Sequence, residues 1–550
     1  MKGAPKVQQI KREDLERLLE HARPALTQPE YEQLKAALDT LVYLTHLVGK
    51  KNTTIARLRQ ILFGASSEKT ADVLKSLVGK NQRAAEEWAP AAEPATAPAE
   101  GGAAAPAHEE PKAAPREGHG RNAAKDYPGA TTIKVEHRSL RAAERCPQCR
   151  RGKLYEMDPG VLVRVSGQAP LAATVYELQK LRCNLCLEVF NTEPPEAVGP
   201  EKYDAGAASM IALLKYGSGL PFYRLAGLQQ GLGIPLPSST QWEIVLNTAG
   251  LVKPALEELI RQAAQGELVH NDDTTMKILS PCGAREVSPT QDARSAIFTS
   301  GILSRREGRT IALFFTGKQH AGENLAQVLA QRATDLGPPV QMCDALSRNA
   351  PGAFKTILAN CLAHARRKYV EVAAQFPEQC RFVLETLAQV YHNDALCKAQ
   401  KHSPGERLLF HQAHSEPLMT KLKTWLSDQI TQHQVEPNSN LGQAIGYMNK
   451  HWNELTLFLR KAGAPLDNNA CEQVLKRAIL HRKNALFYKT DKGAEVGDTF
   501  MSLIHTCALV GANTFDYLNA LQQHARALSH NPGQWMPWNY RDTLCAIHSA

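Results

Sequence analysis

The sequence predicts a multidomain α/β protein, and three features support that prediction. The chain has 550 residues, several times the length of one typical domain. A stretch rich in Ala and Pro, from about Asn81 to Pro128, separates an N-terminal helical segment from the rest. After Gly266, strand-like segments follow one another and are succeeded by a helix and a further strand, which is the order of an α/β sheet.

Composition narrows the class of protein. Hydrophobic residues make up 43% of the chain, and no apolar run reaches the roughly 18 residues that a membrane-spanning helix needs. Residues Met1 to Glu20 lack the apolar core of a secretory signal, so we expect a cytoplasmic protein. Twelve cysteines are too sparse for a disulfide framework. A net charge of +9 suits a polyanionic partner, although an ordinary, slightly basic enzyme would carry it too.

The first predicted module, residues 1–80, is helical. Apolar residues recur in it every seven positions, and a companion seam contains Asn52, a residue type that fixes the register of coiled coils. This pattern favours a short parallel dimer, and the alternative is one amphipathic helix that packs on its own domain. The apolar seam consists of Leu34, Leu41, Val48, Ile55 and Leu62.

The next two segments are a linker and a cysteine-containing module. Residues 81–130 cannot bury enough apolar surface to offset the entropy of ordering, so they form the predicted linker. Residues 131–200 contain short β-like pieces, such as Ala173–Tyr176, and two Cys-x-x-Cys pairs. Four thiolates at such spacing are the ligands of a closed structural zinc site, and redox-active pairs are the alternative. The pairs are Cys146 with Cys149 and Cys183 with Cys186.

Residues 201–262 form a predicted helical segment. We expect helices over Phe222–Gln230 and Thr240–Asn247, with Ser238 and Gln241 spaced as a capping box. Two helices on a Gly-containing turn are typical of a DNA-binding helix-turn-helix, and ordinary helical packing is the alternative. Beyond them we predict strands over Leu268–Leu279, Ala293–Leu303 and Thr310–Thr316, a helix over Ala321–Thr334, a strand over Val340–Asp344 and a helix over Ala470–Leu480.

Three acidic residues of this region are candidates for chemistry. Asp272 lies in the first strand, Asp344 ends a strand at the carboxyl edge where α/β sheets place ligands, and Glu472 begins a helix on its apolar side. Carboxylates that converge from separate elements could hold Mg²⁺. The ordinary alternatives are an Asp that closes a strand and an ion pair between Glu472 and Lys476.

Basic residues crowd the helix after Glu472, with Phe487 and Tyr488 among them. Such a cluster suits a nucleic-acid backbone, and a solvated helix face is the alternative. The candidates for DNA binding in this helix are Lys476, Arg477, Arg482 and Lys483.

Several motifs, in order along nearly the whole chain, resemble those of the insertion-sequence 66 type bacterial transposases. His270–Thr274 resembles the family's His-x-Asp-Glu-Thr motif, with Asp273 in place of Glu. Cys361–Lys368 resembles its Cys-x-x-His-x-Arg-Arg motif, and Asp467–Glu472 its Asp-Asn-Asn-x-x-Glu motif. Further similar segments are Gln60–Lys69, the two cysteine pairs, Leu220–Arg224, Ser238–Trp242 and Met536–Arg541.

This resemblance implies a ribonuclease-H-like catalytic core over residues 263–505, with Asp272, Asp344 and Glu472 as its acidic triad. Because 128 positions (472 minus 344) separate the last two acids, the helical stretch of about 370–461 is expected to be an insertion. The resemblance also implies two magnesium or manganese ions at the triad, structural zinc at the cysteine pairs, and a C-terminal helical tail over 506–550. His364, Arg366 and Arg367 are expected either near the active site or in a structural role, and we count both arginines among the DNA-binding candidates.

The function that follows is expected to be that of a DNA transposase, which cleaves phosphodiesters at the ends of an insertion sequence and joins the 3′-hydroxyl ends to target DNA. Expected partners are double-stranded DNA at the terminal inverted repeats and at the target, further copies of the chain and small accessory proteins, in the bacterial cytoplasm at the nucleoid. A catalytically inactive DNA-binding regulator and a structure-selective nuclease on the same fold remain the alternatives.

Overall fold

A computed structural model describes residues 201–280 and 296–549, short pieces between 142 and 199, and Tyr31 and Lys35. The predicted coiled-coil seam, the linker and the four paired cysteines lie outside the described residues. The described chain divides into two compact units. One contains Tyr203–Pro221 and everything from Trp242 onward, and the other contains Phe222–Gln241 with the pieces before Lys202.

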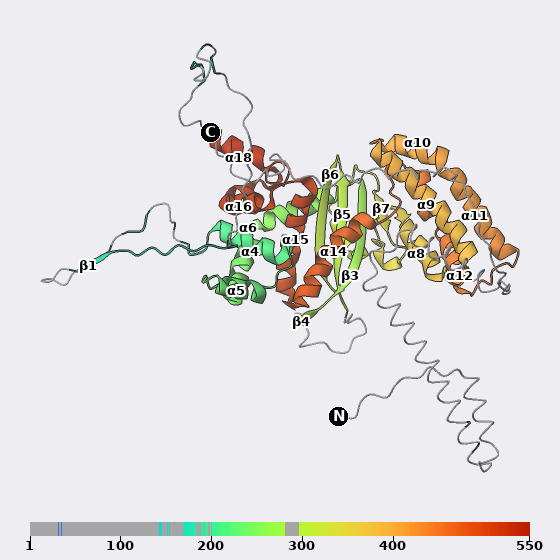
Figure 1. The fold of residues 1–550 in the computed structure, drawn as a ribbon, viewed down its shortest axis with the longest axis horizontal. Coiled ribbons are helices and arrows are strands. Elements are labelled where there is room, and N and C mark those ends of the chain that lie inside the picture. The colour runs from blue at the N-terminus through green and yellow to red at the C-terminus, as the bar shows by residue number, and fades with distance from the viewer. Residues whose placement is uncertain are drawn as a thin grey trace, which may run out of the picture. The chain divides into compact units, whose positions relative to one another are not determined.

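A five-stranded mixed sheet lies at the centre of the larger unit (Figure 1), in the order β6-β5-β3-β7-β8. Three strands form its antiparallel half: β3 (Leu268–Met276), β5 (Ile297–Arg306) and β6 (Arg309–Gly317). The other two, β7 (Val340–Cys343) and β8 (Ile357–Asn360), run parallel to β3. The α/β prediction is therefore confirmed, and the predicted strand over Leu268–Leu279 divides into β3 and the short β4 (Ile278–Ser280), which pairs with β9 (Tyr488–Thr490).

Helices precede the sheet and cover it. Before the sheet come α4 (Ala205–Ala212), the π-helical η4 (Leu213–Gly217), α5 (Phe222–Gly231) and α6 (Ser238–Ala263). Against the sheet and after it come α7 (Ala321–Leu329), the 3₁₀ turn η5 (Ser347–Asn349), α14 (Asn469–Ala485), α15 (Asp491–Val510), α16 (Thr514–Gln523), α17 (Ala525–His530), η7 (Pro532–Gln534) and α18 (Tyr540–Ser549). None of the helices in the described ranges combines the length and the apolar character that a membrane span requires.

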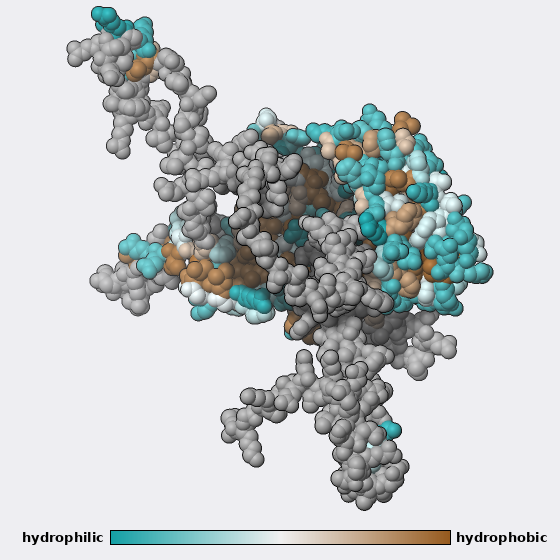
Figure 2. Space-filling model, turned by 45° about the vertical axis from the view of Figure 1, so that its right-hand side comes forward, coloured by the Kyte–Doolittle hydropathy of each residue, from teal (hydrophilic) through white to brown (hydrophobic). Residues whose placement is uncertain are grey.

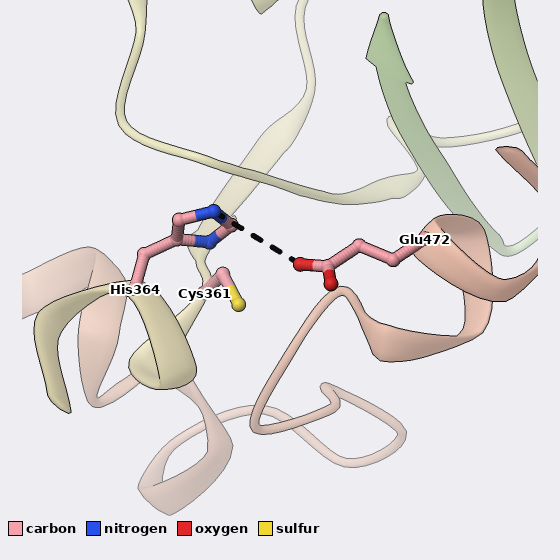
Figure 3. Close-up of side chains that lie close together, drawn as sticks. All are labelled: Cys361, His364 and Glu472. Carbon is pink, nitrogen blue, oxygen red and sulfur yellow. Dashed lines mark ion pairs between the residues drawn. The ribbon is translucent and has the colours of Figure 1, made fainter. Parts of the chain in front are cut away.

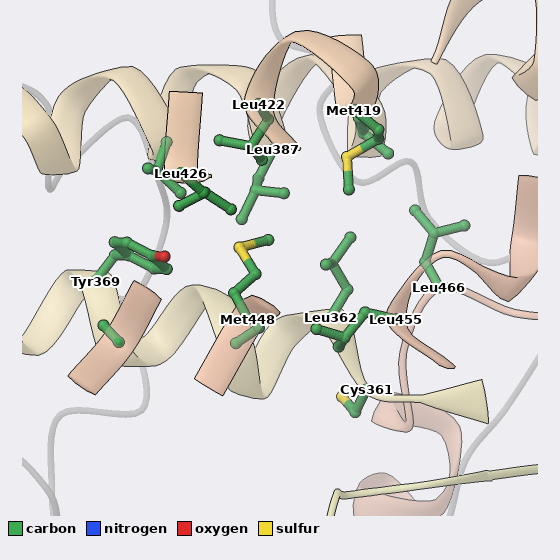
Figure 4. Close-up of a cluster of buried hydrophobic side chains, with 14 of the residues drawn as sticks. Cys361, Leu362, Tyr369, Leu387, Met419, Leu422, Leu426, Met448, Leu455 and Leu466 are labelled. Atoms are coloured by element: carbon green, nitrogen blue, oxygen red, sulfur yellow. The ribbon is translucent and has the colours of Figure 1, made fainter. Parts of the chain in front are cut away.

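A helical lobe occupies the chain between β8 and α14. Its elements are α8 (Leu362–Val372), α9 (Pro377–Ala399), α10 (Pro404–His414), α11 (Glu416–Thr431), α12 (Asn440–Lys450), α13 (Trp452–Leu455) and η6 (Leu457–Leu459). Buried side chains of α8, α9, α11 and α12 form one cluster with Val340 and Met342 of β7 and Ala359 of β8 (Figure 4). The visible outer face of this lobe is mostly hydrophilic (Figure 2), because its apolar side chains pack into this shared core.

Two local predictions are wrong. Ala173–Tyr176 forms no strand: Val175 is 85% exposed, and the hairpin of this region is instead β1 (Lys180–Arg182) with β2 (Val189–Asn191), on either side of the second cysteine pair in the sequence. The capping box of α6 does not form either. The buried Gln241 side chain donates instead to the carbonyl oxygens of Phe222 and Leu236, and its own oxygen has no partner among the described residues.

The helix α6 also extends well beyond the predicted Thr240–Asn247, because it continues through Pro254 to Ala263. Val245, Val252, Ala255 and Leu259 are buried along it. Their spacing of three or four residues, or of seven, gives the helix one apolar face over its whole length, and packing of that face outweighs the cost of the internal proline.

Candidate functional site

Asp272 and Asp344 occupy equivalent positions on neighbouring parallel strands. The register pairs Leu268 of β3 with Val340 of β7 and His270 with Met342, an offset of 72 residues (340 minus 268). The same offset leads from Asp272 to Asp344, directly after the last residue of β7. Side chains two residues apart on a strand share a face, and parallel strands lie about 4.8 Å apart, so both carboxylates project side by side from one face of the sheet.

The helix α14 brings Glu472 to the same face. Gly301 of β5 lies opposite Asp272, and a Cβ at Gly301 would lie 3.0 Å from the side chain of Leu475. The Cys471 thiol donates to the carbonyl oxygen of Gly301 at 3.4 Å. The missing side chain at Gly301 therefore lets the first turn of α14 approach the sheet, which puts Glu472 near Asp272.

Burial and the neighbouring acids both affect the ionisation of Asp272. Burial raises its pKa to about 7, and the negative charges of Asp344, Asp273 and Glu472 act in the same direction, against the hydrogen bond that Asp272 accepts from the Asp273 amide. Carboxyl oxygens that repel one another in a half-buried site suit a hard divalent cation, because the cation neutralises them and prefers oxygen ligands. The donor set therefore fits magnesium.

Asn468 ties together the three motifs around the acids. It is fully buried, and its Oδ1 lies 3.0 Å from Nδ1 of His270, while its Nδ2 donates to the carbonyl oxygen of Asn271. Its backbone amide donates to the Sγ of Cys361 at 3.2 Å. Asn468 is the residue before α14, and its side chain makes no capping bond with that helix but faces the sheet.

A buried polar network holds Asp344. The Asn349 side chain donates to Asp344 Oδ1, as does the amide of Leu346. Gln341 in β7 donates to the carbonyl oxygen of Asn349 at 2.7 Å and to the side chain of Asn271 in β3 at 2.8 Å. Asn349 and Gln341 were not predicted from the sequence. The signal was available in Gln341, a polar residue in the otherwise apolar strand Val340–Cys343.

Asp273 lies on the opposite face of the sheet from Asp272. Its side chain is 1% exposed and forms ion pairs with His320 Nδ1 at 2.9 Å and with Arg348 at 3.1 Å. Because Arg348 belongs to the turn that follows Asp344, this ion pair fastens the loop of the second acid to the strand of the first.

Cys361 and His364 lie next to each other and face the carboxylate of Glu472 (Figure 3). Cys361 follows β8 as the residue before α8, and His364 lies in the first turn of α8. Nε2 of His364 is 3.9 Å from Oε1 of Glu472. Burial raises the pKa of the Cys361 thiol to about 12, so in the absence of a cation this sulfur keeps its proton.

The predicted DNA-binding residues have different surroundings. Lys476, Arg477 and Lys483 are exposed on α14. Arg482 donates to the side chains of Thr274 and Thr275 and so joins α14 to the end of β3. Arg366 is only 9% exposed, whereas Arg367 is half-buried. The open cationic surface is therefore that of Lys476, Arg477 and Lys483.

Comparisons with known proteins identify the family. The model of the Transposase IS66 family matches residues 202–496, which are 295 positions (496 minus 202, plus one) and more than half of the chain. The uncharacterized protein y4jD of Sinorhizobium fredii is 28% identical over 354 residues, which cover 61% of this chain and 65% of y4jD, just under two thirds of it. The uncharacterized protein y4hP of the same organism is 26% identical over 421 residues, 73% of this chain and 74% of y4hP. The matched region includes the strands, the helical lobe and the helix that bring the three acids together, and by this match the chain belongs to the IS66 family of transposases.

Proposed function

We propose that the protein cleaves phosphodiesters at the ends of an insertion sequence and joins the 3′-hydroxyl ends to target DNA, with Asp272, Asp344 and Glu472 as the catalytic carboxylates. The observation that supports the proposal is the placement of the three acids: the register of β3 with β7, continued by two residues, brings Asp344 beside Asp272, and the first turns of α14, which carry Glu472, pack on Gly301 opposite Asp272. Three antiparallel strands followed by two parallel ones are also the arrangement expected of a ribonuclease-H-like core.

The three carboxylates would hold magnesium or manganese, two ions of which assist attack of an oxygen nucleophile and departure of the leaving oxygen in such reactions. The chain's own residues orient the site. Asn349 and the Leu346 amide hold Asp344, and Asn468 positions the start of α14 and hence Glu472. The ion pair of Asp273 with Arg348 fastens the turn after Asp344 to strand β3.

Binding of DNA is proposed for the cationic surface of α14. Lys476, Arg477 and Lys483 are exposed within four turns of Glu472 on the same helix, and a phosphate backbone held there would lead toward the acids. Zinc at the two cysteine pairs, pairing of protomers through the heptad seam, and small accessory proteins complete the proposal. These three rest on the sequence pattern and the family.

The test is mobilisation of a marked mini-element in a bacterial host, with native flanking DNA and any neighbouring small reading frames supplied. Wild type is compared with Asp344→Asn and with Asp335→Asn, a matched change of an exposed residue ahead of β7. We expect movement with wild type and with Asp335→Asn and none with Asp344→Asn at equal protein level. Equal movement of the element with all three proteins would show that Asp344 is not a catalytic residue.

The two rival functions predict other results. A DNA-binding regulator gives no movement in any variant but still binds the element's ends in a gel-shift assay. A structure-selective nuclease cuts branched DNA that lacks the element's ends, and it produces no joined product. Strand transfer to a target plasmid therefore separates the three functions.

A further inference from the structure

Three potential metal ligands meet where β8 passes into α8. The register that pairs Cys343 with Asn360 places Cys361 beside Asp344 when it continues by one residue. His364 follows in the first turn of α8, and Glu472 reaches the same place from α14 (Figure 3). Their three ligand atoms, one S, one N and one O, lie within 4.8 Å of one another.

The distances suit a shared ion better than direct bonds. Nε2 of His364 and Oε1 of Glu472 are 3.9 Å apart, which is too long for a hydrogen bond. Two ligands of one tetrahedral zinc ion are separated by about 3.4 to 3.6 Å, because zinc–ligand bonds are about 2.0 to 2.3 Å long. Side-chain rotations that shift these atoms by about an ångström would bring the set to that geometry.

The burial of polar atoms in this cluster also favours a bound cation. Oε1 of Glu472 and Nδ1 of His364 are both shielded from solvent, and neither has a hydrogen-bond partner among the described residues. A buried acceptor without a partner is costly, and a cation that binds Glu472 would remove that cost.

We propose that Cys361, His364 and Glu472 form a binding site for a borderline-soft divalent ion such as Zn²⁺, and that the ion inhibits the enzyme by taking Glu472 from the acidic triad. A thiolate and an imidazole select zinc over magnesium, whereas the carboxylates of Asp272 and Asp344 favour magnesium. Glu472 belongs to both sets, so an ion held by Cys361 and His364 competes with magnesium for its carboxylate. The zinc site stands on its own geometry, and the inhibition rests on the function proposed above.

Binding is tested with Co²⁺ as a spectroscopic substitute for zinc. The full-length chain is purified in zinc and dialysed against a mild chelator, which leaves zinc at any four-thiolate site of the Cys-x-x-Cys pairs and removes it from a weaker three-ligand site. It is then titrated with Co²⁺ while the ultraviolet thiolate-to-cobalt band is recorded. We expect wild type to gain a band that saturates at one equivalent and Cys361→Ser to lack it. His364→Asn and Glu472→Gln should bind about tenfold more weakly or worse. Cys545→Ser removes an exposed cysteine far along the chain and should keep the band.

Thermal unfolding of each variant shows that it is folded before its spectrum is compared. An unchanged band in Cys361→Ser would overturn the site. A band that disappears in Cys361→Ser but is unaffected by both His364→Asn and Glu472→Gln would also overturn it, because the cysteine would then bind cobalt with other ligands.

Inhibition is tested by magnesium-dependent cleavage of end DNA at rising zinc concentration, with each variant compared with its own zinc-free rate. Wild type should lose cleavage at the zinc concentration that displaces cobalt, and Cys361→Ser should retain it to at least tenfold higher zinc. Equal inhibition of both proteins would overturn the inhibitory role. The cobalt titration alone would then decide whether the metal site exists. If no variant cleaves DNA even without zinc, the proposed function fails, the inhibitory role falls with it, and the cobalt titration still decides the site.

Discussion

At the scale of single residues, the acids of the site depend on buried amides that carry no charge. Asn468 joins the strand of Asp272, the start of α8 and the start of α14 through one side chain and one backbone amide. Asn349 donates to Asp344, and Gln341 in turn donates to the carbonyl oxygen of Asn349, so β7 holds the turn that positions this acid. Buried amides with several partners fix side-chain direction, because every alternative rotamer leaves a polar atom unsatisfied.

We expect Asn468→Ala to reduce strand cleavage by tenfold or more and to lower the free energy of unfolding by about 1 to 3 kcal/mol, since His270 and the Asn271 carbonyl lose a partner in the interior. Asn469→Ala is the matched control, because Asn469 is exposed and bonds only to Asp467 nearby. The measurements are cleavage of end DNA and urea unfolding. Equal effects of the two substitutions would show that Asn468 has no special part in positioning.

The buried carboxyl group of Asp498 is expected to make the stability of the protein depend on pH. It is buried against β6, where it accepts hydrogen bonds from the Thr316 amide at 2.6 Å and from the Thr316 hydroxyl at 2.7 Å. Burial raises its pKa from 3.8 to about 7. Between these values the folded state holds a proton that the unfolded chain has released, so stability is greatest below about pH 4 for this group and falls as pH rises to about 7.

We therefore expect the free energy of unfolding of wild type to fall across this window relative to Asp498→Asn, by up to about 4 kcal/mol. The difference between the two proteins isolates this group, because Asp272, whose pKa is also raised, is present in both. The measurement is urea unfolding at intervals from pH 4 to pH 8. Parallel curves for the two proteins would contradict the assignment.

At the scale of elements, α15 covers the open edge of the sheet. Three side chains of α15, spaced four residues apart, accept hydrogen bonds from three backbone amides of β6, spaced two residues apart. The acceptors are Thr506, Ser502 and Asp498, and the donors are the amides of Ala312, Phe314 and Thr316, in that order. Four helical residues rise about 6 Å and two strand residues about 6.6 Å, so the two spacings match. Polar side chains of a helix thus replace the missing neighbour strand, which protects the edge from pairing with another chain.

Ser502→Ala should destabilise the protein by about 1 to 3 kcal/mol and speed hydrogen exchange of the Phe314 amide, because that buried amide loses its acceptor. Ser549→Ala is the control, since this serine is exposed and donates only to Cys545 in its own helix. Hydrogen exchange followed by mass spectrometry checks both. Unchanged exchange at β6 in Ser502→Ala would mean that water or another group replaces the hydroxyl.

At the scale of the whole molecule, the helical lobe and the sheet share one core. Leu387, Leu422 and Met448 of the lobe belong to the same buried cluster as Met342 of β7 (Figure 4). The strand that carries Asp344 is thus supported on one side by a lobe inserted far along the chain. A substitution that weakens packing within the lobe is therefore expected to make β7, and with it Asp344, less rigid.

We expect Leu422→Ala to lower the free energy of unfolding by about 2 to 5 kcal/mol and to increase hydrogen exchange in β7 and β8 as well as in α11. Leu409→Ala, at a leucine that is 67% exposed on α10, should do neither. Exchange that increases in the lobe alone would show that lobe and sheet unfold as separate units.

The sequence by itself determined most of the strands and helices around the sheet, and it singled out the three acids that are proposed as catalytic. Alternating and helical periodicities predicted β5, β6, β7, α7 and α14 to within a few residues, and the motifs identified the family that the comparisons confirm. The helix α15 was not predicted as an element. It is buried on nearly all sides, and polar residues such as Asp498, Ser502 and Thr506 occupy buried positions where an apolar face would be expected.

Only the tertiary structure decided what those segments do to one another. The offset of 72 residues that puts Asp344 beside Asp272 comes from strand pairing, and the meeting of His364 with Glu472, 108 residues later (472 minus 364), comes from the packing of α8 and α14. Tertiary packing also turned Gln241 away from its expected capping bond toward buried carbonyl oxygens. The physical reason is that local periodicity sets the direction of a side chain relative to its own element, whereas its partners are set by packing between distant segments.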